Sequence, residues 1–394
     1  GVAALQPVLR RSGGDLVYVV PFVPSRDGER LHCELEWLLT RNAGFACVVK
    51  LRASPSLRPV TLLAPWDAED EGEEGAKAQS TFVIPRLSPS SSFAFLLQHV
   101  ASAGSAKHVY LQLAVMHTTL EGDRLIRTLT LRLPVALHLN NVFRFADCDV
   151  LSTVFLKFFS FLGLKGQGQS CTQVLTKDLV KMLFAYRKRC AANTSPASLT
   201  LPPAIKTLPL AVQSAFKLPD LRGTLDQQVA ALLRYLTLPV EEAVAALHPR
   251  IVPLLDQPDN VCAPTGVGDH IIVPVPIPPS SASLGADGVF LVDAGGGPLW
   301  LCFGPETPGE IVSELLGPPG AGPARVVDST EGGAAVLSIA DQLRRVSLRR
   351  AHRPVVLGSV DLLAGFMLED DQGGHPSYRR FLAELHRSVQ YYVE

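Results

Sequence analysis

The spacing of apolar residues changes along the chain and divides it into regions of different secondary structure. From residue 47 to about 137, apolar and polar positions alternate with a period of two, as in strands with one buried face. The clearest part is a hairpin in which Val109–Val115 and Leu125–Leu133 flank the turn Glu121-Gly122-Asp123, and Pro134 ends the second strand. This pattern predicts an antiparallel β-sandwich over 47–137.

Beyond residue 138 the apolar positions recur every three or four residues, which is the period of a helix. Helices are expected around 143–162, 175–186, 229–236 and 240–247, with prolines between them. The pattern therefore predicts a helical domain over 138–256. Residues 257–283 are rich in proline and glycine, which indicates a linker or an extended segment.

The last part of the chain returns to mixed structure. Val289–Val292 and Leu299–Phe303 read as two apolar strands, and a helix is expected at Gly309–Leu316. In the final helix the apolar residues form one stripe, made of Tyr378, Phe381, Leu382, Leu385, Val389 and Tyr392. We expect a small α/β module over 284–394, whose last helix must dock on another surface.

The first 46 residues read as the end of an α/β domain. The apolar run Leu16–Val20 follows a Gly-Gly turn and predicts a buried strand. Leu31, Leu35 and Leu38 then repeat at helical spacing, with Gly44 as the expected C-cap. Because the chain starts with Gly1, inside what reads as an element, we expect a fragment without its N-terminal portion.

Two segments are expected to be loops. Asp67–Glu74 holds six acids and few apolar groups, which favours a solvated loop over an acidic binding site. Gly163–Gly168 resembles a flexible loop and has no strand before it. It therefore lacks the setting of a phosphate-binding loop.

The composition excludes several classes of protein. With 47% hydrophobic and 19% charged residues, the chain has enough apolar material for packed cores. The 36 basic and 37 acidic side chains nearly cancel, so the chain has no global attraction for nucleic acid, and no nucleic-acid partner is expected. The seven cysteines are scattered and never spaced C-x-x-C, which argues against a disulfide framework or a zinc site and favours a reducing compartment.

The sequence offers no recognisable catalytic constellation. It has no H-E-x-x-H pair, no G-x-S-x-G elbow and no G-x-x-x-x-G-K-[ST] loop. The adjacent carboxylates Glu369, Asp370 and Asp371 could share a proton or bind a cation, but such a run is more often a solvated end of an element. We therefore expect a protein that is not an enzyme, with no catalytic, cofactor-binding or metal-binding residue.

Two groups of basic residues are candidate binding sites. Lys50 and Arg52 are two positions apart on a predicted strand, so both side chains point to one face and can meet an acidic peptide signal or a terminal carboxylate. The alternative is an ordinary solvated pair. A second group could face anionic lipid headgroups, with a partner-facing surface or a solvated helix as the alternatives; it consists of Arg344, Arg345, Arg349, Arg350 and Arg353, with His352 among them.

Short segments spread over nearly the whole chain carry a family resemblance, and their order and spacing are its strong part. In chain order they are Leu5–Tyr18, Val48–Arg52, Leu57–Pro59, Asp123–Pro134, Asn141–Phe143, Ala146-Asp147, Leu238–Val240, His248–Leu254, Gly288–Phe303, Leu368–Asp370, and Ser377-Tyr378 with Phe381-Leu382. Together they resemble the cargo-adaptor subunit of the COPII inner coat, the Sec24 family.

The resemblance implies a multidomain α+β fold. Residues 1–46 would be the end of an α/β trunk like a von Willebrand A domain, 47–137 the β-sandwich, 138–256 the helical domain, 257–283 the linker, and 284–394 a gelsolin-like module with a C-terminal helix. The zinc finger of the family and most of its trunk would lie outside this chain, so no cofactor is expected here.

The resemblance also implies a function and partners. The protein would act in the cytoplasm, bound peripherally to the cytosolic face of the endoplasmic reticulum membrane and to COPII vesicles. It would bind the partner coat subunit of the Sec23 family and be recruited by a small Sar-type GTPase. It would then select cargo and SNARE proteins by their sorting-signal peptides, with the basic pair at Lys50 and Arg52 contributing to an acidic-signal pocket.

Three other interpretations stay open on the sequence. The sister GTPase-activating coat subunit shares the architecture. An actin-binding gelsolin-like protein would explain only the final module. An enzyme with an unrecognised site is the third, but the sequence shows no nucleophile–base pair.

Overall fold

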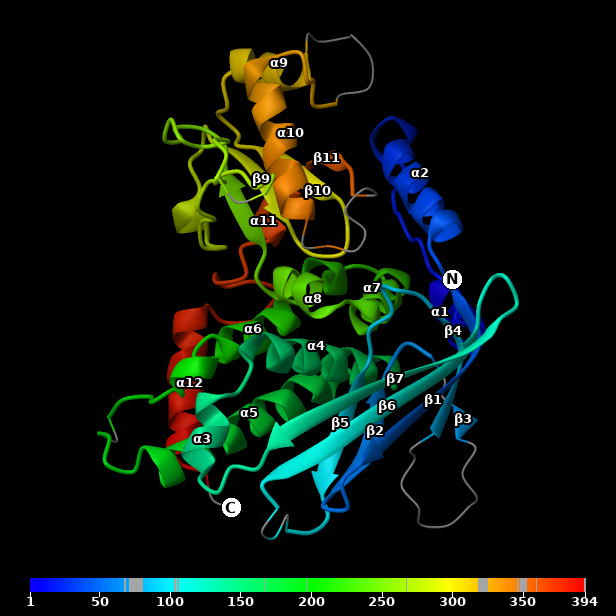
Figure 1. The fold of residues 1–394 in the computed structure, drawn as a ribbon. Helices are drawn as coiled ribbons and strands as arrows, with labels where there is room; N and C mark the ends of the chain where they lie inside the picture. The colour runs from blue at the N-terminus through cyan, green and yellow to red at the C-terminus, as the bar shows by residue number, and fades with distance from the viewer. Residues whose placement is uncertain are drawn as a thin grey trace.

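The structure, a computed structural model, describes most of the chain. The described residues are 1–66, 69–70, 81–102, 104, 106–166, 168–195, 197–266, 268–317, 325–345, 347, 353–358 and 360–392. Figure 1 shows a lower half in which a β-sandwich lies beside a bundle of helices, and an upper half with a small mixed sheet and its helices. The predicted multidomain α+β fold class is confirmed.

Strands from the first third of the chain form two sheets that face each other. They are β1 (Gly44–Ala53), β2 (Leu57–Leu63), β3 (Glu69–Asp70), β4 (Thr81–Leu87), β5 (Ala94–His99), β6 (His108–Thr118) and β7 (Arg124–Pro134). One described sheet has the order β3-β4-β1-β6-β7 and the other is the pair β2-β5. The predicted hairpin is confirmed as β6 and β7, with Val109 opposite Leu133 and Val115 opposite Arg127.

The sandwich core lies under only part of the larger sheet. Cys47 and Val49 of β1 and Phe82 and Ile84 of β4 are buried against aromatic side chains from the smaller sheet and its loops. By contrast, every residue of the edge strand β7 is exposed. The smaller sheet has two described strands, so its apolar cover ends before it reaches β7.

The helical region follows directly after β7. Its elements are α3 (Leu139–Arg144), α4 (Cys148–Leu164), α5 (Gly168–Cys190), η1 (Pro203–Ile205), α6 (Leu208–Lys217), η2 (Pro219–Arg222), α7 (Leu225–Thr237) and α8 (Val240–Leu247). Helix α4 begins at an aspartate cap, since the Asp147 carboxylate accepts hydrogen bonds from the backbone N–H groups of Asp149 and Val150. Helix α7 begins with a capping box formed by Thr224 and Gln227.

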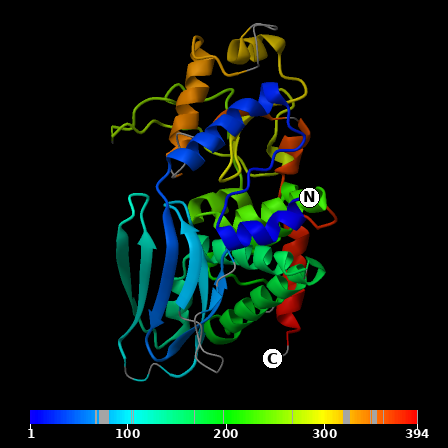
Figure 2. The ribbon, with the colours of Figure 1, turned by 90° about the vertical axis from the view of Figure 1, so that its right-hand side faces the viewer.

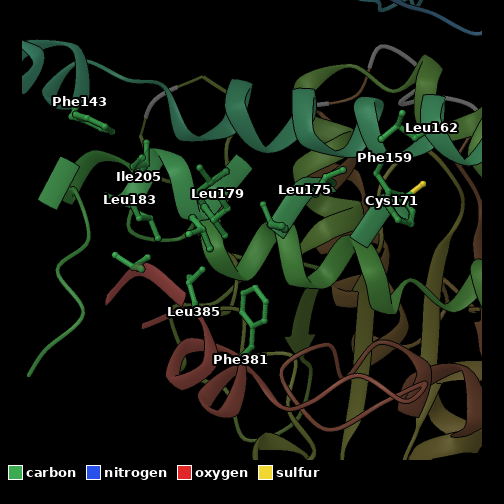
Figure 3. Close-up of a cluster of buried hydrophobic side chains, with 14 of the residues drawn as sticks. Phe143, Phe159, Leu162, Cys171, Leu175, Leu179, Leu183, Ile205, Phe381 and Leu385 are labelled. Atoms are coloured by element: carbon green, nitrogen blue, oxygen red, sulfur yellow. The ribbon is translucent and has the colours of Figure 1, made fainter. Parts of the chain in front are cut away.

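The final helix, α12 (Tyr378–Gln390), docks on this helical region, although about 130 residues of chain separate them. Phe381 and Leu385 point from α12 toward Leu179 and Leu183 of α5, as Figure 3 shows. Leu385 is 1% exposed, so its side chain is fully inside this core. The predicted apolar stripe of the last helix is therefore confirmed, together with the surface that receives it.

The upper unit is built on a sheet with the order β11-β10-β9-β8. Its elements are β8 (Arg250–Pro253), η3 (Ser281–Ser283), β9 (Val289–Asp293), β10 (Leu299–Phe303), α9 (Gly309–Leu316), α10 (Glu331–Arg344), β11 (Val355–Gly358) and α11 (Val360–Gly365). The two predicted strands and the helix at Gly309–Leu316 are confirmed. All five residues of β9 are buried, which explains why it reads as a continuous apolar run.

The N-terminal helices connect the two halves. Helix α1 (Val2–Ser12) packs on α7, whereas α2 (Pro24–Thr40) lies against the upper unit, and Figure 2 shows this arrangement from the side. The prediction of a buried strand at Leu16–Val20 is wrong, because this segment is neither a strand nor fully buried. A continuous apolar run becomes a strand only where neighbouring strands pair with it, and none of the described strands does.

Four further expectations need correction. Gly44 is not a C-cap: α2 ends at Thr40 with Arg41 as its cap, and Gly44 opens β1. The expected loop at 163–168 is shorter, because α4 continues to Leu164 and α5 begins at Gly168. The predicted helical region 138–256 is not helical to its end, because residues 250–253 form strand β8. Within the acidic stretch, residues 69–70 pair with β4, and its remaining residues lie outside the described ranges.

Candidate functional site

Strand β1 presents two basic side chains on the outer face of the five-stranded sheet. Val49 and Leu51 are 0% and 6% exposed and point into the sandwich core. Lys50 and Arg52 alternate with them, so they point away from the core, and Arg52 is exposed. The prediction that both cations share one face is confirmed, whereas their role in binding stays a prediction.

Polar groups extend this face across the neighbouring strands. Arg52 lies directly opposite Gln112 of β6, and its Nη1 donates to Gln112 Oε1 at 3.3 Å. The amide of Gln112 in turn donates from Nε2 to Thr130 Oγ1 of β7 at 3.2 Å. Lys50 is flanked by the smaller residues Thr81 and Ala114 on the adjacent strands. The outer face is therefore a polar surface around a basic pair, held on a paired and rigid strand.

The second basic group is not a single surface. Arg353 is 2% exposed, and its Nη2 lies 2.5 Å from Oδ1 of Asp293, a carboxylate that is 0% exposed. Its Nε also donates to the carbonyl oxygen of Gly297 at 2.7 Å. The expectation that Arg353 faces lipid or a partner is therefore wrong, because this guanidinium neutralises a buried carboxylate.

The remaining members of that group differ in their surroundings. Arg344 is half-buried at the end of α10, and burial lowers its pKa from the ordinary arginine value. Arg345 is also half-buried and pairs with Asp341 one turn earlier at 3.3 Å. Arg349 and Arg350 lie outside the described residues. A membrane- or partner-facing role for these four arginines stays a prediction.

The carboxylates before the last helix hold backbone groups. Asp370 accepts hydrogen bonds from Ser280 Oγ at 2.7 Å and from the N–H of Ser281 at 2.8 Å. Burial alone would raise the pKa of Asp370, but these hydrogen bonds outweigh it and lower the pKa. Asp371 accepts from the N–H of Ser377 at 2.8 Å, just before α12 begins. Asp370 thus holds the linker and Asp371 holds the start of the last helix, while the Asp371 side chain itself stays 60% exposed.

A cavity of about 610 Å³ lies where the N-terminal segment, the sandwich, α7 and the upper sheet meet. Arg30 of α2 lies over the Trp300 ring of β10 at 5.9 Å, and Arg234 of α7 pairs with Asp220 at 2.6 Å; all four residues line this cavity. Sequence reasoning missed this cluster, because its members come from segments far apart in the chain and share no local motif.

The described part of the chain shows no metal site and no membrane span. None of its clusters brings together three or more His, Cys, Asp or Glu side chains in a way that could hold a metal ion. Within the same residues, no helix is both long enough and apolar enough to cross a bilayer.

Comparisons with known proteins match two parts of this chain to known domains. The family model of the Sec23/Sec24 β-sandwich domain matches residues 44–136, and that of the Sec23/Sec24 helical domain matches residues 147–245. The chain is 26% identical to Protein transport protein SEC24 B of Arabidopsis thaliana over 99% of its own length and 35% of that protein. It is also 26% identical to human Protein transport protein Sec24A, over 80% of its length and 28% of that protein.

A solved structure shows the same fold. The crystal structure of the human COPII-coat protein Sec24c matches 99% of this chain and 50% of that protein's chain, with a TM-score of 0.81 and 21% sequence identity. The chain spans about a third of the length of the curated relatives named here.

The class defined by these observations is a β-sandwich followed by a helical domain of the Sec23/Sec24 type. Residues 44–136 and 147–245 match these two domains, and the relatives that the chain matches along most of its length carry the name Sec24. The resemblance drawn from the sequence is thereby confirmed.

Proposed function

We propose that this chain is part of a COPII vesicle-coat subunit that selects cargo for export from the endoplasmic reticulum by binding cytosolic sorting signals. The Sec24 relatives and the fold of the COPII-coat protein support the coat assignment. The observation that carries the binding role is the outward-facing pair Lys50 and Arg52 on a rigid strand. We propose no catalytic role.

The geometry suits an acidic signal in an extended conformation. Two residues along a strand span about 6.6 Å, so the two cations can contact carboxylates at alternate positions of an extended peptide. Arg52 can offer two parallel N–H donors to one carboxylate, whereas Lys50 provides a point charge. The smaller neighbours Thr81 and Ala114 leave space beside the Lys50 stem.

The proposal includes partners. We infer binding to the partner coat subunit of the Sec23 family and recruitment to the endoplasmic reticulum membrane by a small Sar-type GTPase. A pull-down from cytosol with the full-length protein tests the coat assignment, and recovery of the Sec23-type subunit is the expected result. Its absence under conditions where another Sec24 protein recovers it would argue against this assignment.

The signal-binding site has its own test. A fluorescent peptide with acidic residues at alternate positions is titrated against the full-length protein and against the double variant Lys50→Ala/Arg52→Ala. We expect the double variant to weaken binding about tenfold or more, because both charge-assisted hydrogen bonds are lost. Arg58→Ala is a matched control. Arg58 is an exposed arginine on the other sheet, and it donates to Gln98 at 2.9 Å as Arg52 does to Gln112. Unchanged binding by the double variant would reject this site.

A further inference from the structure

The connection between the sandwich and the helical region exposes a stripe of large apolar side chains. Leu137 is 87% exposed, Leu139 39%, Val142 52% and Phe145 78%. Leu139 and Val142 are spaced three residues apart and are neighbours on helix α3, and Phe145 caps the C-terminal end of that helix. These four residues are called the α3 surface below. Figure 1 shows α3 between the end of β7 and helix α5.

The exposure is not caused by a loosely packed helix. A neighbouring side of α3 carries Phe143, which is 8% exposed and belongs to the helical core. Its ring meets the Tyr186 ring of α5 edge-on, with 4.9 Å between the centroids. Because Phe143 fixes the rotation of α3, the apolar stripe is held toward solvent. Four large apolar groups held outside a core in this way mark an interaction surface.

The α3 surface is bordered by positive charge. The Arg144 guanidinium lies 5.5 Å from the centre of the Phe145 ring and is exposed. The last turn of α5, which packs against α3, reads Arg187-Lys188-Arg189. Two acids follow at the start of α4, and one of them, Asp147, already caps that helix by accepting two backbone N–H groups. The charge on the α5 side of the stripe is therefore positive.

A recess adjoins the stripe. It is lined by Leu137, His138, Leu139, Asn140, Asn141 and Arg189. All six of these residues are exposed, so leucine, imidazole, amide and guanidinium groups are available to a ligand there. An apolar side chain of a ligand can enter such a recess, the amides can meet its backbone, and the guanidinium can meet a carboxylate beside it.

We propose that the α3 surface and its recess form a second peptide-binding site, which takes a short segment that alternates large apolar and acidic residues. Charge complementarity with Arg144 and Arg189 selects an acidic partner. A membrane is less well matched, because a recess with amide walls offers shape and hydrogen bonds to a peptide, whereas a lipid surface needs a protruding apolar face. This site lies on a different element from Lys50 and Arg52 and does not depend on them.

The test uses the full-length protein and a fluorescent peptide that alternates Leu or Phe with Asp or Glu. In a protein that also carries Lys50→Ala/Arg52→Ala, so that the first site does not bind the peptide, we expect Arg189→Glu and Leu137→Ser each to weaken binding about tenfold, because one removes the paired charge and the other the apolar contact. Both positions are exposed, so the variants should keep their fold, which thermal unfolding checks. The double variant Lys50→Ala/Arg52→Ala should retain binding at the α3 surface, which separates the two sites.

A charge exchange makes the test sharper. A peptide with Lys in place of each acid should not bind the Lys50→Ala/Arg52→Ala protein, but it should bind Arg189→Glu in that background more tightly than the acidic peptide does. Three results would overturn the proposal. The first is acidic-peptide binding that is unchanged in both α3-surface variants. The second is binding of vesicles of phosphatidylcholine and phosphatidylserine through these residues while the peptide does not bind. The third is self-association in sedimentation that both variants abolish.

Discussion

Lys157 Nζ donates a hydrogen bond to the carbonyl oxygen of Leu236 at 2.5 Å, and each residue is only 1% exposed. The same ammonium lies 3.3 Å from the carbonyl oxygen of Ser92, in the loop between β4 and β5. One side chain of α4 thus joins the last turn of α7 to the sandwich. The negative end of the α7 dipole favours a cation there, but burial lowers the pKa of Lys157 to about 7.

This arrangement predicts a pH dependence of stability. The pKa of Lys157 is lower in the folded protein than its ordinary value of 10.5. Between pH of about 7 and about 10 the unfolded chain therefore binds more protons at this position, so the free energy of unfolding should rise with pH by up to about 1 kcal/mol per pH unit. Urea unfolding at several pH values measures this rise in the free energy of unfolding. Hydrogen exchange of the α4 and α7 amides shows where in the protein it arises.

Lys157→Met is the variant for comparison, because it keeps the length of the side chain and removes the titrating group. We expect the rise in the free energy of unfolding with pH, as hydrogen exchange in α4 and α7 reports it, to disappear in this variant. A control, Lys181→Met, removes a lysine whose side chain is 48% exposed and which pairs with Asp178 on α5. It should leave the slope in α4 and α7 unchanged. An equal slope in the Lys157→Met variant would contradict the prediction.

The sequence predicted best those elements whose stability comes from neighbours nearby in the chain or from a long periodic pattern. The β6–β7 hairpin follows from alternation around one turn, and α12 follows from one apolar stripe. The single-faced placement of Lys50 and Arg52 follows from the same two-residue period. These inferences need only local geometry, so they hold without knowledge of the tertiary structure.

The missed features depend on contacts between distant segments. The run Leu16–Val20 is as apolar as β9, yet β9 has partners on both sides and this run has none among the described strands. In the sequence Arg353 reads as part of a basic patch. Its burial could be foreseen only from its pairing with Asp293, which lies sixty residues earlier in the chain. The arginine–tryptophan contact between α2 and β10 likewise has no local signal. Charge and hydropathy patterns cannot reveal such pairings.

The buried carboxylate of Asp293 should be essential for the upper unit. It binds the guanidinium groups of Arg353 and Arg250 and accepts the N–H of Gly295 at 3.0 Å. Burial would raise its pKa, but Arg353 and Arg250 outweigh this and lower it. Its contribution to stability is therefore present above the ordinary aspartate pKa of 3.8 and is lost as the pH falls below it.

Asp293→Asn should lower the free energy of unfolding by about 3–5 kcal/mol, because two arginines then lose the charge that balances them. Hydrogen exchange of the β8 and β9 amides is the measurement. Asp341→Asn provides the comparison, since Asp341 is 49% exposed and pairs with a half-buried arginine one turn away. It should change stability by less than about 1 kcal/mol. Equal losses of stability in the two variants would contradict the prediction that the buried carboxylate of Asp293 contributes more to stability than the exposed carboxylate of Asp341.

The docking of α12 should depend on its buried stripe. Leu385→Ala removes a side chain that is 1% exposed and leaves a cavity against α5, so we expect a loss of about 2–5 kcal/mol. We expect faster protease cleavage between residues 371 and 378 and faster hydrogen exchange in α12. Tyr391→Ala, at a position that is 81% exposed at the end of the same helix, should have an effect within about 0.5 kcal/mol. Equal protease sensitivity of both variants would contradict this docking.

One row of leucines across the five-stranded sheet tests how far the sandwich core extends. Leu51 of β1 lies opposite Leu113 of β6, which lies opposite Leu129 of β7, so the three side chains share the inner face. Their surroundings differ, because Leu51 is 6% exposed and Leu129 is 68% exposed. We expect Leu51→Ala to lower the free energy of unfolding by about 2–5 kcal/mol and Leu129→Ala to change it by no more than about 0.5 kcal/mol. Urea unfolding of the 394-residue chain, followed by hydrogen exchange in β1, measures both. If Leu129→Ala were as destabilising as Leu51→Ala, the inner face of β7 would have to be covered in solution, which would contradict the exposed edge strand described above.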